Sequence, residues 1–365
     1  MNATADLYAD RVGRALPKVL LHEHLDGGLR VATLLDLLQQ RGSTAPAPDA
    51  ASLAAWFNAN AHAGSLEKYL EGFALTVAAM ASAAALRRVA FEAAEDARAD
   101  GAVLAEFRIA PLLFEAHGLS GEAAVEALLE GLAQSPLATG LIVCGMRHLA
   151  PEETQRAARL ALRYQGRGVV GFDLAGAEFG HPPAEHAAAI TLVRDAGLGL
   201  TLHAGEADAA ERVLEAGRLG ATRIGHGVRL VDALSAPAGS ARRALVDEAI
   251  ALDLHLEVCP TSNVHTGAAR SIASHPITAL WHAGLSLSYH TDNRLMSCIT
   301  HSSEAAALLR HTALTRDDLL AMARQAAAHS FLPQAARTAA LASIDAAAVR
   351  AATASAVADP NAAPP

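Results

Sequence analysis

The chain has 365 residues, of which 52% are hydrophobic and 18% are charged, and its formal net charge is −9. This composition excludes a disordered chain, and the acidic balance excludes a strongly basic surface for nucleic acid or anionic lipid. The three cysteines form no CxxC pair and the first residues contain no apolar signal segment, so we expect a cytoplasmic protein that acts on a small molecule.

Short apolar runs, often β-branched and bounded by Gly or Pro, alternate with helix-like segments along the chain, as buried parallel strands do. The predicted strands cover residues 18–26, 102–111, 140–148, 168–176, 199–206, 221–230, 252–260 and 285–293. Eight strand–helix units predict an α/β fold, a (β/α)₈ TIM-type barrel. An open doubly wound sheet is the alternative, but it leaves unexplained why reactive side chains end six of the eight strands.

The connection between the first two predicted strands, residues 29–100, is far longer than a usual crossover and contains helical stretches at 33–40, 53–60, 66–80 and 83–99. In the third stretch, apolar residues recur at helical spacing. They are Leu66, Tyr69, Leu70 and Phe73. An insertion here would lie over the mouth of the barrel, so we predict a hydrophobic lid, with ordinary packing onto the barrel as the alternative. We expect one domain over 1–357 and a disordered tail over 358–365.

The first predicted strand ends in the motif HEHLDG, residues 22–27. Because side chains alternate along a strand, His22 and His24 lie on one face, and Asp26 falls on the same face. Two neighbouring neutral imidazoles form half of a zinc site. We therefore interpret this segment as the start of a metal centre rather than as buried core.

Two further strand ends supply the remaining ligands. His203 closes the fifth strand in the motif HAGE, and Asp292 follows the eighth strand in the motif TDN. Three imidazoles and one carboxylate leave room for water on a zinc ion, as a catalytic site requires. The two lysines, Lys18 and Lys68, do not end a strand that could place them as a bridge between two metals. The sequence thus predicts one Zn²⁺ per chain.

More polar residues lie close to these strand ends. Glu206, three residues past His203, is placed to act as a general acid, with a residue beside a helix N-cap as the alternative. His226, between two glycines, is interpreted as a base or an electrostatic clamp, with a core histidine as the alternative. Cys259 is expected to be a packed thiol, and Arg108 a structural ion-pair residue.

Taken in order, the motifs HxHxDG, DLAGAE at 173–178, HAGE, GHG, CPTSN and TDN resemble those of the adenosine deaminase family. The resemblance covers residues 14–330 and is closest to a bacterial branch of that family. Each motif alone is weak, but the ordered set is highly specific. No PCxxC motif of the other zinc deaminase class occurs in the chain.

The resemblance implies roles for individual residues. It implies that His22, His24, His203 and Asp292 hold the zinc, that Glu206 protonates purine nitrogen 1, and that His226 orients or deprotonates the attacking water. The implied substrate contacts are His24, Asp26 to the ribose 5′-hydroxyl, Gly176 to nitrogen 3 and Asn293 to nitrogen 7. Mammalian-type members carry an aspartate where this chain has Asn293, which donates to nitrogen 7 without needing to be protonated.

The function implied is zinc-dependent hydrolytic deamination of a 6-aminopurine nucleoside, adenosine or 2′-deoxyadenosine, with no nucleic-acid or membrane partner. Aminodeoxyfutalosine or free adenine is the alternative substrate, because these compounds share the purine face and differ at the ribose end. A mononuclear zinc amidohydrolase and a catalytically silent binding protein are the alternatives from other classes. The silent protein would require a lost ligand or acid, and none is lost.

Overall fold

The computed structural model of the protein describes residues 3–62 and 72–357, and eight parallel strands form its centre. The strands are β1 Lys18–Leu20, β2 Ala102–Ile109, β3 Thr139–Met146, β4 Val169–Ala175, β5 Gly199–Ala204, β6 Arg223–His226, β7 His255–Val258 and β8 Ser286–Tyr289. They pair in sequence order from β1 to β8. A parallel bridge between Glu23 and Asp292 joins the two edges, so the sheet closes into the predicted barrel and the open-sheet alternative is wrong.

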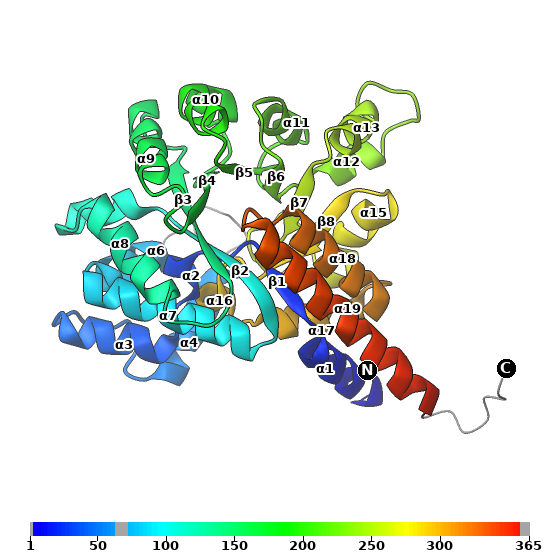
Figure 1. The fold of residues 1–365 in the computed structure, drawn as a ribbon, viewed down its shortest axis with the longest axis horizontal. Helices are drawn as coiled ribbons and strands as arrows, with labels where there is room; N and C mark the ends of the chain where they lie inside the picture. Colours follow the sequence, from blue (N-terminus) through cyan, green and yellow to red (C-terminus); the bar gives the residue numbers. More distant parts are fainter. Residues whose placement is uncertain (1–2, 63–71, 358–365) are drawn as a thin grey trace.

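Helices surround the strands (Figure 1). After β2 they are α8 Gly121–Leu132, α9 Pro151–Arg163, α10 Ala187–Asp195, α11 Glu211–Arg218, α12 Leu230–Leu234, α13 Ala244–Ala251, α14 Pro260–His265, α15 Ile277–His282, α16 Arg294–Ser297, α17 His301–His311, α18 Arg316–His329 and α19 Gln334–Val357. Short 3₁₀ helices lie at η1 Pro111–His117, η2 Pro183–His186 and η3 Ile272–Ser274. Helix α1 Ala3–Ala15 precedes β1 and packs against α17. Each strand therefore delivers its last residues to one end of the barrel, where βα-barrel enzymes carry their sites.

The predicted insertion between β1 and β2 is helical. Its described helices are α2 Leu25–Gly28, α3 Val31–Gln40, α4 Ala50–Ala61, α6 Gly72–Met80 and α7 Ala83–Ala99. Of the four proposed lid residues, Leu66, Tyr69 and Leu70 lie outside the described residues, and Phe73 is half-buried in α6. The strand predicted over 18–26 is shorter than expected, because His24 already serves as the N-cap of α2. Asp26 consequently lies in a helical turn rather than on a strand.

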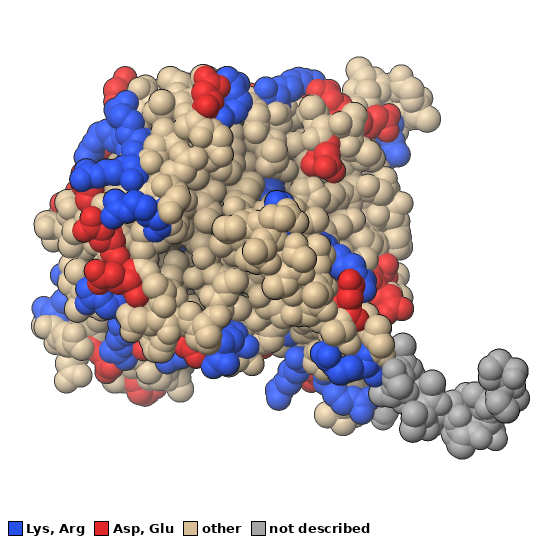
Figure 2. All heavy atoms as spheres, viewed as in Figure 1, with Lys and Arg blue, Asp and Glu red and all other residues tan. Residues whose placement is uncertain are grey.

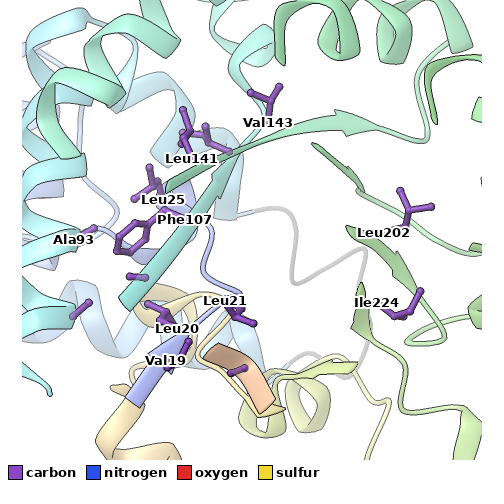
Figure 3. Close-up of a cluster of buried hydrophobic side chains, with 14 of the residues drawn as sticks. Val19, Leu20, Leu21, Leu25, Ala93, Phe107, Leu141, Val143, Leu202 and Ile224 are labelled. Carbon is purple, nitrogen blue, oxygen red and sulfur yellow. The ribbon is translucent and has the colours of Figure 1, made fainter. Parts of the chain in front are cut away.

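The apolar core lies between the strands and the surrounding helices. Phe107 and Leu141 on neighbouring strands are fully buried, as are Leu25 of α2 and, nearly so, Ala93 of α7. Figure 3 shows these side chains gathered on the outer side of the strands. The barrel interior is more polar, since Arg108 and Glu257 are both fully buried there and form an ion pair. Buried charges require such partners.

The outer surface in Figure 2 shows basic and acidic side chains interspersed around the edge of the molecule. Many of them form pairs between helices, such as Arg156 with Glu115 and Arg218 with Glu248. Over the described ranges, no single helix is long and apolar enough to cross a membrane. The pair α6 and α7 passes that test only when taken together, and it is bent by 114°.

Candidate metal centre and substrate pocket

Four proposed ligands converge at the carboxyl ends of β1, β5 and β8. The Nε2 atoms of His24 and His203 lie 3.3 Å apart. Asp292 Oδ1 lies 3.4 Å from His22 Nε2 and 3.6 Å from His24 Nε2. A tetrahedral ion with bonds of about 2.0–2.1 Å has ligand atoms about 3.3–3.4 Å from one another. The separations therefore match those that one small metal ion requires.

The ligand atoms also have the chemistry of a metal site. His22 Nε2 is buried and has no hydrogen-bond partner among the described residues. Desolvation lowers the pKa of His24 well below its usual range, so its imidazole is neutral and free to coordinate. Burial opposes ionisation of Asp292, but the neighbouring His22, whose Nε2 lies 3.4 Å from Asp292 Oδ1, holds the pKa of Asp292 below the usual range. The residues fit a divalent cation.

Two backbone positions at this site are strained. His226 has φ of 66° and Asp292 has φ of 59°, in the left-handed region that residues other than glycine rarely adopt. Such strain collects at functional sites, where the surrounding structure imposes the conformation. Here the left-handed backbone turns the His226 and Asp292 side chains toward the point on which the rings of His22, His24 and His203 converge.

Further groupings of donor atoms include His226 and Cys259. His22, His203 and His226 form one buried set whose nitrogens lie within 4.8 Å of one another, and His22, Cys259 and Asp292 form a second set. Burial raises the pKa of the Cys259 thiol well above its usual range. A protonated thiol is a poor ligand, which favours the prediction of a packed cysteine. Because the His226 ring belongs to the first of these sets, it lies close enough to act on a molecule bound at the metal.

Buried carboxylates orient two of the histidines. Glu257 Oε2 accepts a hydrogen bond from His22 Nδ1 at 2.8 Å, and Asp173 Oδ2 lies 2.9 Å from His203 Nδ1. Arg108 joins the two carboxylates, with Nη1 2.8 Å from Asp173 and Nη2 2.5 Å from Glu257. A carboxylate at Nδ1 fixes the imidazole tautomer and leaves Nε2 for the metal. The prediction that Arg108 is an ion-pair residue is confirmed.

Sequence reasoning missed Glu257, and no role was predicted for Asp173. A signal for Glu257 existed, because a carboxylate between Leu256 and Val258 of a predicted buried strand requires a buried partner. Ser262 on α14 was missed as well, although it lies within the CPTSN motif. Its hydroxyl donates to Asp292 Oδ2 at 2.5 Å and so orients the fourth proposed ligand.

The Glu206 carboxyl is held beside the metal cluster. Its Oε1 accepts hydrogen bonds from Asn263 Nδ2 at 3.1 Å and from Thr266 Oγ1 at 2.8 Å. Its Oε2 lies 3.5 Å from His226 Nε2, and the opposite nitrogen of that ring, Nδ1, is 3.0 Å from Asn263 Nδ2. Glu206 and His226 therefore form a connected carboxyl and imidazole pair on one side of the centre.

A cavity of about 390 Å³ opens onto this centre. The lining contains His24, Asp26, Gly176, Glu206 and Asn293, for which the family resemblance implies contact with the substrate, and Phe73 from the proposed lid. Its apolar side is formed by Ala110, Leu113, Cys144, Met146 and Ala175. An apolar cavity of this size with a few convergent polar groups is typical of a small-molecule site.

Two lining residues present polar atoms with no described partner. They are Asp26 Oδ1 and Asn293 Oδ1, both buried. Burial raises the pKa of Asp26 to about 7. Gly176 has φ of 94°, and a Cβ there would lie 2.8 Å from His148 Nδ1, so the position requires glycine. A bound molecule can satisfy the unpaired atoms and approach the backbone at Gly176 closely.

A closed parallel barrel with a buried histidine metal-binding group at its carboxyl end defines the class of (β/α)₈ metal-dependent hydrolases. Within that class, the model of a family described as adenosine deaminase matches residues 17–347. The chain belongs to the adenosine deaminase family, and the resemblance found in its motifs is confirmed.

Individual relatives and solved structures are similar to this chain in sequence or in fold. The chain is 44% identical over 333 residues to the adenosine deaminase of Mycobacterium tuberculosis strain H37Rv, covering 88% of this chain and 91% of that protein. Its fold is similar to that of an adenine deaminase from Arthrobacter aurescens, with a TM-score of 0.81, 22% identity, and 90% and 98% of the two chains covered. A zinc-bound amidohydrolase from Burkholderia ambifaria gives a TM-score of 0.82 at 24% identity, with 97% and 96% covered.

Proposed function

We propose that this enzyme, a hydrolase of C–N bonds, replaces the 6-amino group of adenosine or 2′-deoxyadenosine by oxygen and releases ammonia. One observation carries the proposal: the metal-binding cluster and the separate carboxyl of Glu206 face the same cavity. A hydrolytic deaminase needs both an activated water and a proton for the ring nitrogen. The 44% identity to an adenosine deaminase supports the same reaction.

We further propose one zinc ion per chain, held by His22, His24, His203 and Asp292. The distances among their ligand atoms and the unpaired Nε2 of His22 support this set. When bound, the metal supplies a water molecule whose pKa is lowered to about 7. The carboxylates of Glu257 and Asp173 keep two of the imidazoles in the coordinating tautomer.

The chain's own groups would then move the protons. Glu206 would donate its proton to purine nitrogen 1 as water adds to carbon 6, with His226 orienting that water. The Glu206 carboxylate would then take up the proton that the water gives up and pass it to the 6-amino group, which leaves as ammonia while the carbon 6 hydroxyl returns a proton to Glu206 and becomes the carbonyl. His226 Nδ1 next to Asn263 fixes the ring, so that Nε2 faces Glu206 and the cavity. Asn263 and Thr266 both hold Glu206 Oε1, which leaves Oε2 to face the reacting ring.

The remaining polar groups would fix the substrate. The side-chain N–H of Asn293 would donate to purine nitrogen 7, and the backbone N–H at Gly176 would donate to nitrogen 3. Asp26 would accept a hydrogen bond from a ribose hydroxyl. Phe73 of α6 covers the ligand from the insertion, which makes that insertion part of a single catalytic domain.

Charge favours a nucleoside over a nucleotide. Among the described residues, the cavity lining contains four acidic residues and no lysine or arginine. A 5′-phosphate would meet Asp26 without a compensating cation. Free adenine would leave the Asp26 carboxyl unpaired, which disfavours it as well.

The loss of adenine absorbance tests the proposal with a panel of adenosine, 2′-deoxyadenosine, AMP, adenine and aminodeoxyfutalosine. We expect the two nucleosides to have the highest kcat/KM, and AMP to be at least ~10-fold poorer because its phosphate lacks a cation. Preference for adenine or aminodeoxyfutalosine would replace the substrate assignment. Absence of deamination for every compound, with metal bound, would reject the reaction itself.

A further inference from the structure

Glu178 is a buried carboxylate that has no role in the proposed mechanism. It lies in the loop after β4, is 3% exposed, and lines the cavity. Its carboxylate accepts hydrogen bonds from four consecutive backbone N–H groups of the turn that follows β5. They are those of Gly205 to Oε1 at 2.5 Å, and of Glu206, Ala207 and Asp208 to Oε2 at 2.9, 2.7 and 3.2 Å.

This turn is an anion-binding concavity built from main-chain donors. Gly205 has φ of 69°, and the left-handed residue turns the successive N–H groups toward one point. Oε2 of Glu178 accepts three of the four N–H groups and Oε1 accepts the fourth, so backbone donors use most of the acceptor capacity of this carboxylate. Glu178 therefore binds the protein backbone rather than the substrate, although it lines the cavity.

Glu206 lies in this turn, and both its backbone N–H and its backbone carbonyl form hydrogen bonds. Its N–H donates to Glu178, and its carbonyl accepts from Arg229 Nε at 3.2 Å. Its carboxyl is held independently by Asn263 and Thr266 of the α14 region. The acid thus lies between two supports, one acting on its backbone and one on its side chain.

We propose that Glu178 is a positioning residue that sets the proton-donating geometry of Glu206 through the backbone of residues 205–208. This proposal rests on the acid role of Glu206 in the proposed function. A displacement of about 1 Å at a reacting group can lower a rate by about 10²-fold. Glu178 thus controls the proton-transfer step without touching the substrate.

A double-mutant cycle tests the proposal in the full-length, metal-loaded enzyme. Glu178→Gln keeps the shape but replaces one acceptor oxygen by a donor, so we expect kcat to fall about 10- to 100-fold with KM and metal content nearly unchanged. In the Glu206→Gln background, the same substitution should lower kcat by no more than about twofold, because no acid remains to be positioned. Glu185→Gln, an exposed change on the same segment, is the matched control and should leave kcat unaltered.

The outcomes separate this inference from the proposed function. If Glu206→Gln alone keeps near-full turnover, the acid role in the proposed function is wrong. If Glu206→Gln is impaired and Glu178→Gln adds its whole loss to it, Glu178 is only structural and the inference fails.

A second variant and a second measurement cover the case in which Glu178→Gln does not fold. Glu178→Asp keeps the charge, draws the carboxylate back by one methylene, and should give the same non-additive cycle. In the unsubstituted enzyme, the amides of Glu206 and Ala207 should exchange with solvent slowly, because Glu178 holds them. Rapid exchange at both amides would overturn the proposal.

Discussion

The two ends of the barrel interior differ in whether their buried polar groups have hydrogen-bond partners. Toward the amino ends of the strands, Glu106 accepts from Arg223, Ser330 and the Phe331 backbone, and the Arg223 guanidinium stacks 3.8 Å above the Phe331 ring. At the carboxyl ends, His22, Asp26 and Asn293 keep polar atoms without described partners. The first end is electrostatically complete, whereas the second is complete only with a ligand.

Glu257 connects the two ends. Its Oε1 accepts from Arg223 Nε at 2.6 Å and from Thr201 Oγ1 at 3.0 Å, and its Oε2 accepts from His22 and Arg108. The paired charges near the amino ends thus stabilise the fold, and we expect the unpaired polar atoms near the carboxyl ends to bind a ligand, in keeping with the barrel architecture. Substitutions at the two ends should therefore differ in what they damage.

The largest effect is expected from removing a proposed ligand. His22→Ala should lose both the metal and at least ~10³-fold in activity, since three remaining ligands bind zinc poorly. Elemental analysis of the purified variant checks this, and chelation of the unsubstituted enzyme should abolish activity in parallel. Two stoichiometric metals in the active enzyme, or turnover after complete chelation, would contradict the single-metal site.

Glu257→Gln should affect both ends of the barrel. Removing the carboxylate that orients His22 is expected to weaken metal affinity by about 10- to 100-fold and also to destabilise the fold. Competition with a chelator gives the first quantity, and denaturant unfolding gives the second. Normal metal affinity in this variant would mean that the contact with His22 is incidental.

Glu106→Gln should affect only the amino end. Leaving the buried guanidinium of Arg223 with one carboxylate partner fewer is expected to lower the free energy of unfolding by about 3 kcal/mol. Metal content and kcat of the folded variant should be unchanged, and Glu152→Gln, an exposed change, is the control. A large fall in kcat without loss of stability would break the contrast between the two ends.

The smallest effect is expected at the proposed lid. Phe73→Ser removes an aromatic wall of the cavity, so KM should rise about fivefold or more while the metal is retained. Phe91→Ser, at a phenylalanine of α7 that does not line the cavity, is the matched control. An unchanged KM would favour ordinary packing of the insertion over a lid.

The barrel and the convergence of the four proposed metal ligands were predictable because their signals are local. A histidine pair or an aspartate at the end of an apolar run has few explanations other than a ligand, and His22, His24, His203 and Asp292 all gave that signal. The supporting contacts were not predictable, because they join segments far apart in the chain. Arg108 and Glu257 are 149 residues apart, yet they meet inside the barrel.

Glu178 illustrates the same limit. Its partners are backbone N–H groups, which carry no mark in the sequence, so its proposed role can be inferred only when the β4 and β5 loops are in place. The length of the first strand was also beyond prediction, because the extended residue His24 could equally continue a strand or cap a helix.

The central claim is that the metal ligands and the proton donor are different residues of one site, and a single pair of variants tests it. Glu206→Gln should retain about one zinc per chain and bind inosine-like product while kcat falls at least ~10²-fold, because glutamine cannot transfer the proton. His203→Ala, three residues earlier, should lose the metal itself. If Glu206→Gln emptied the site of zinc or kept near-full turnover, the division of the site into metal ligands and a separate acid would be contradicted.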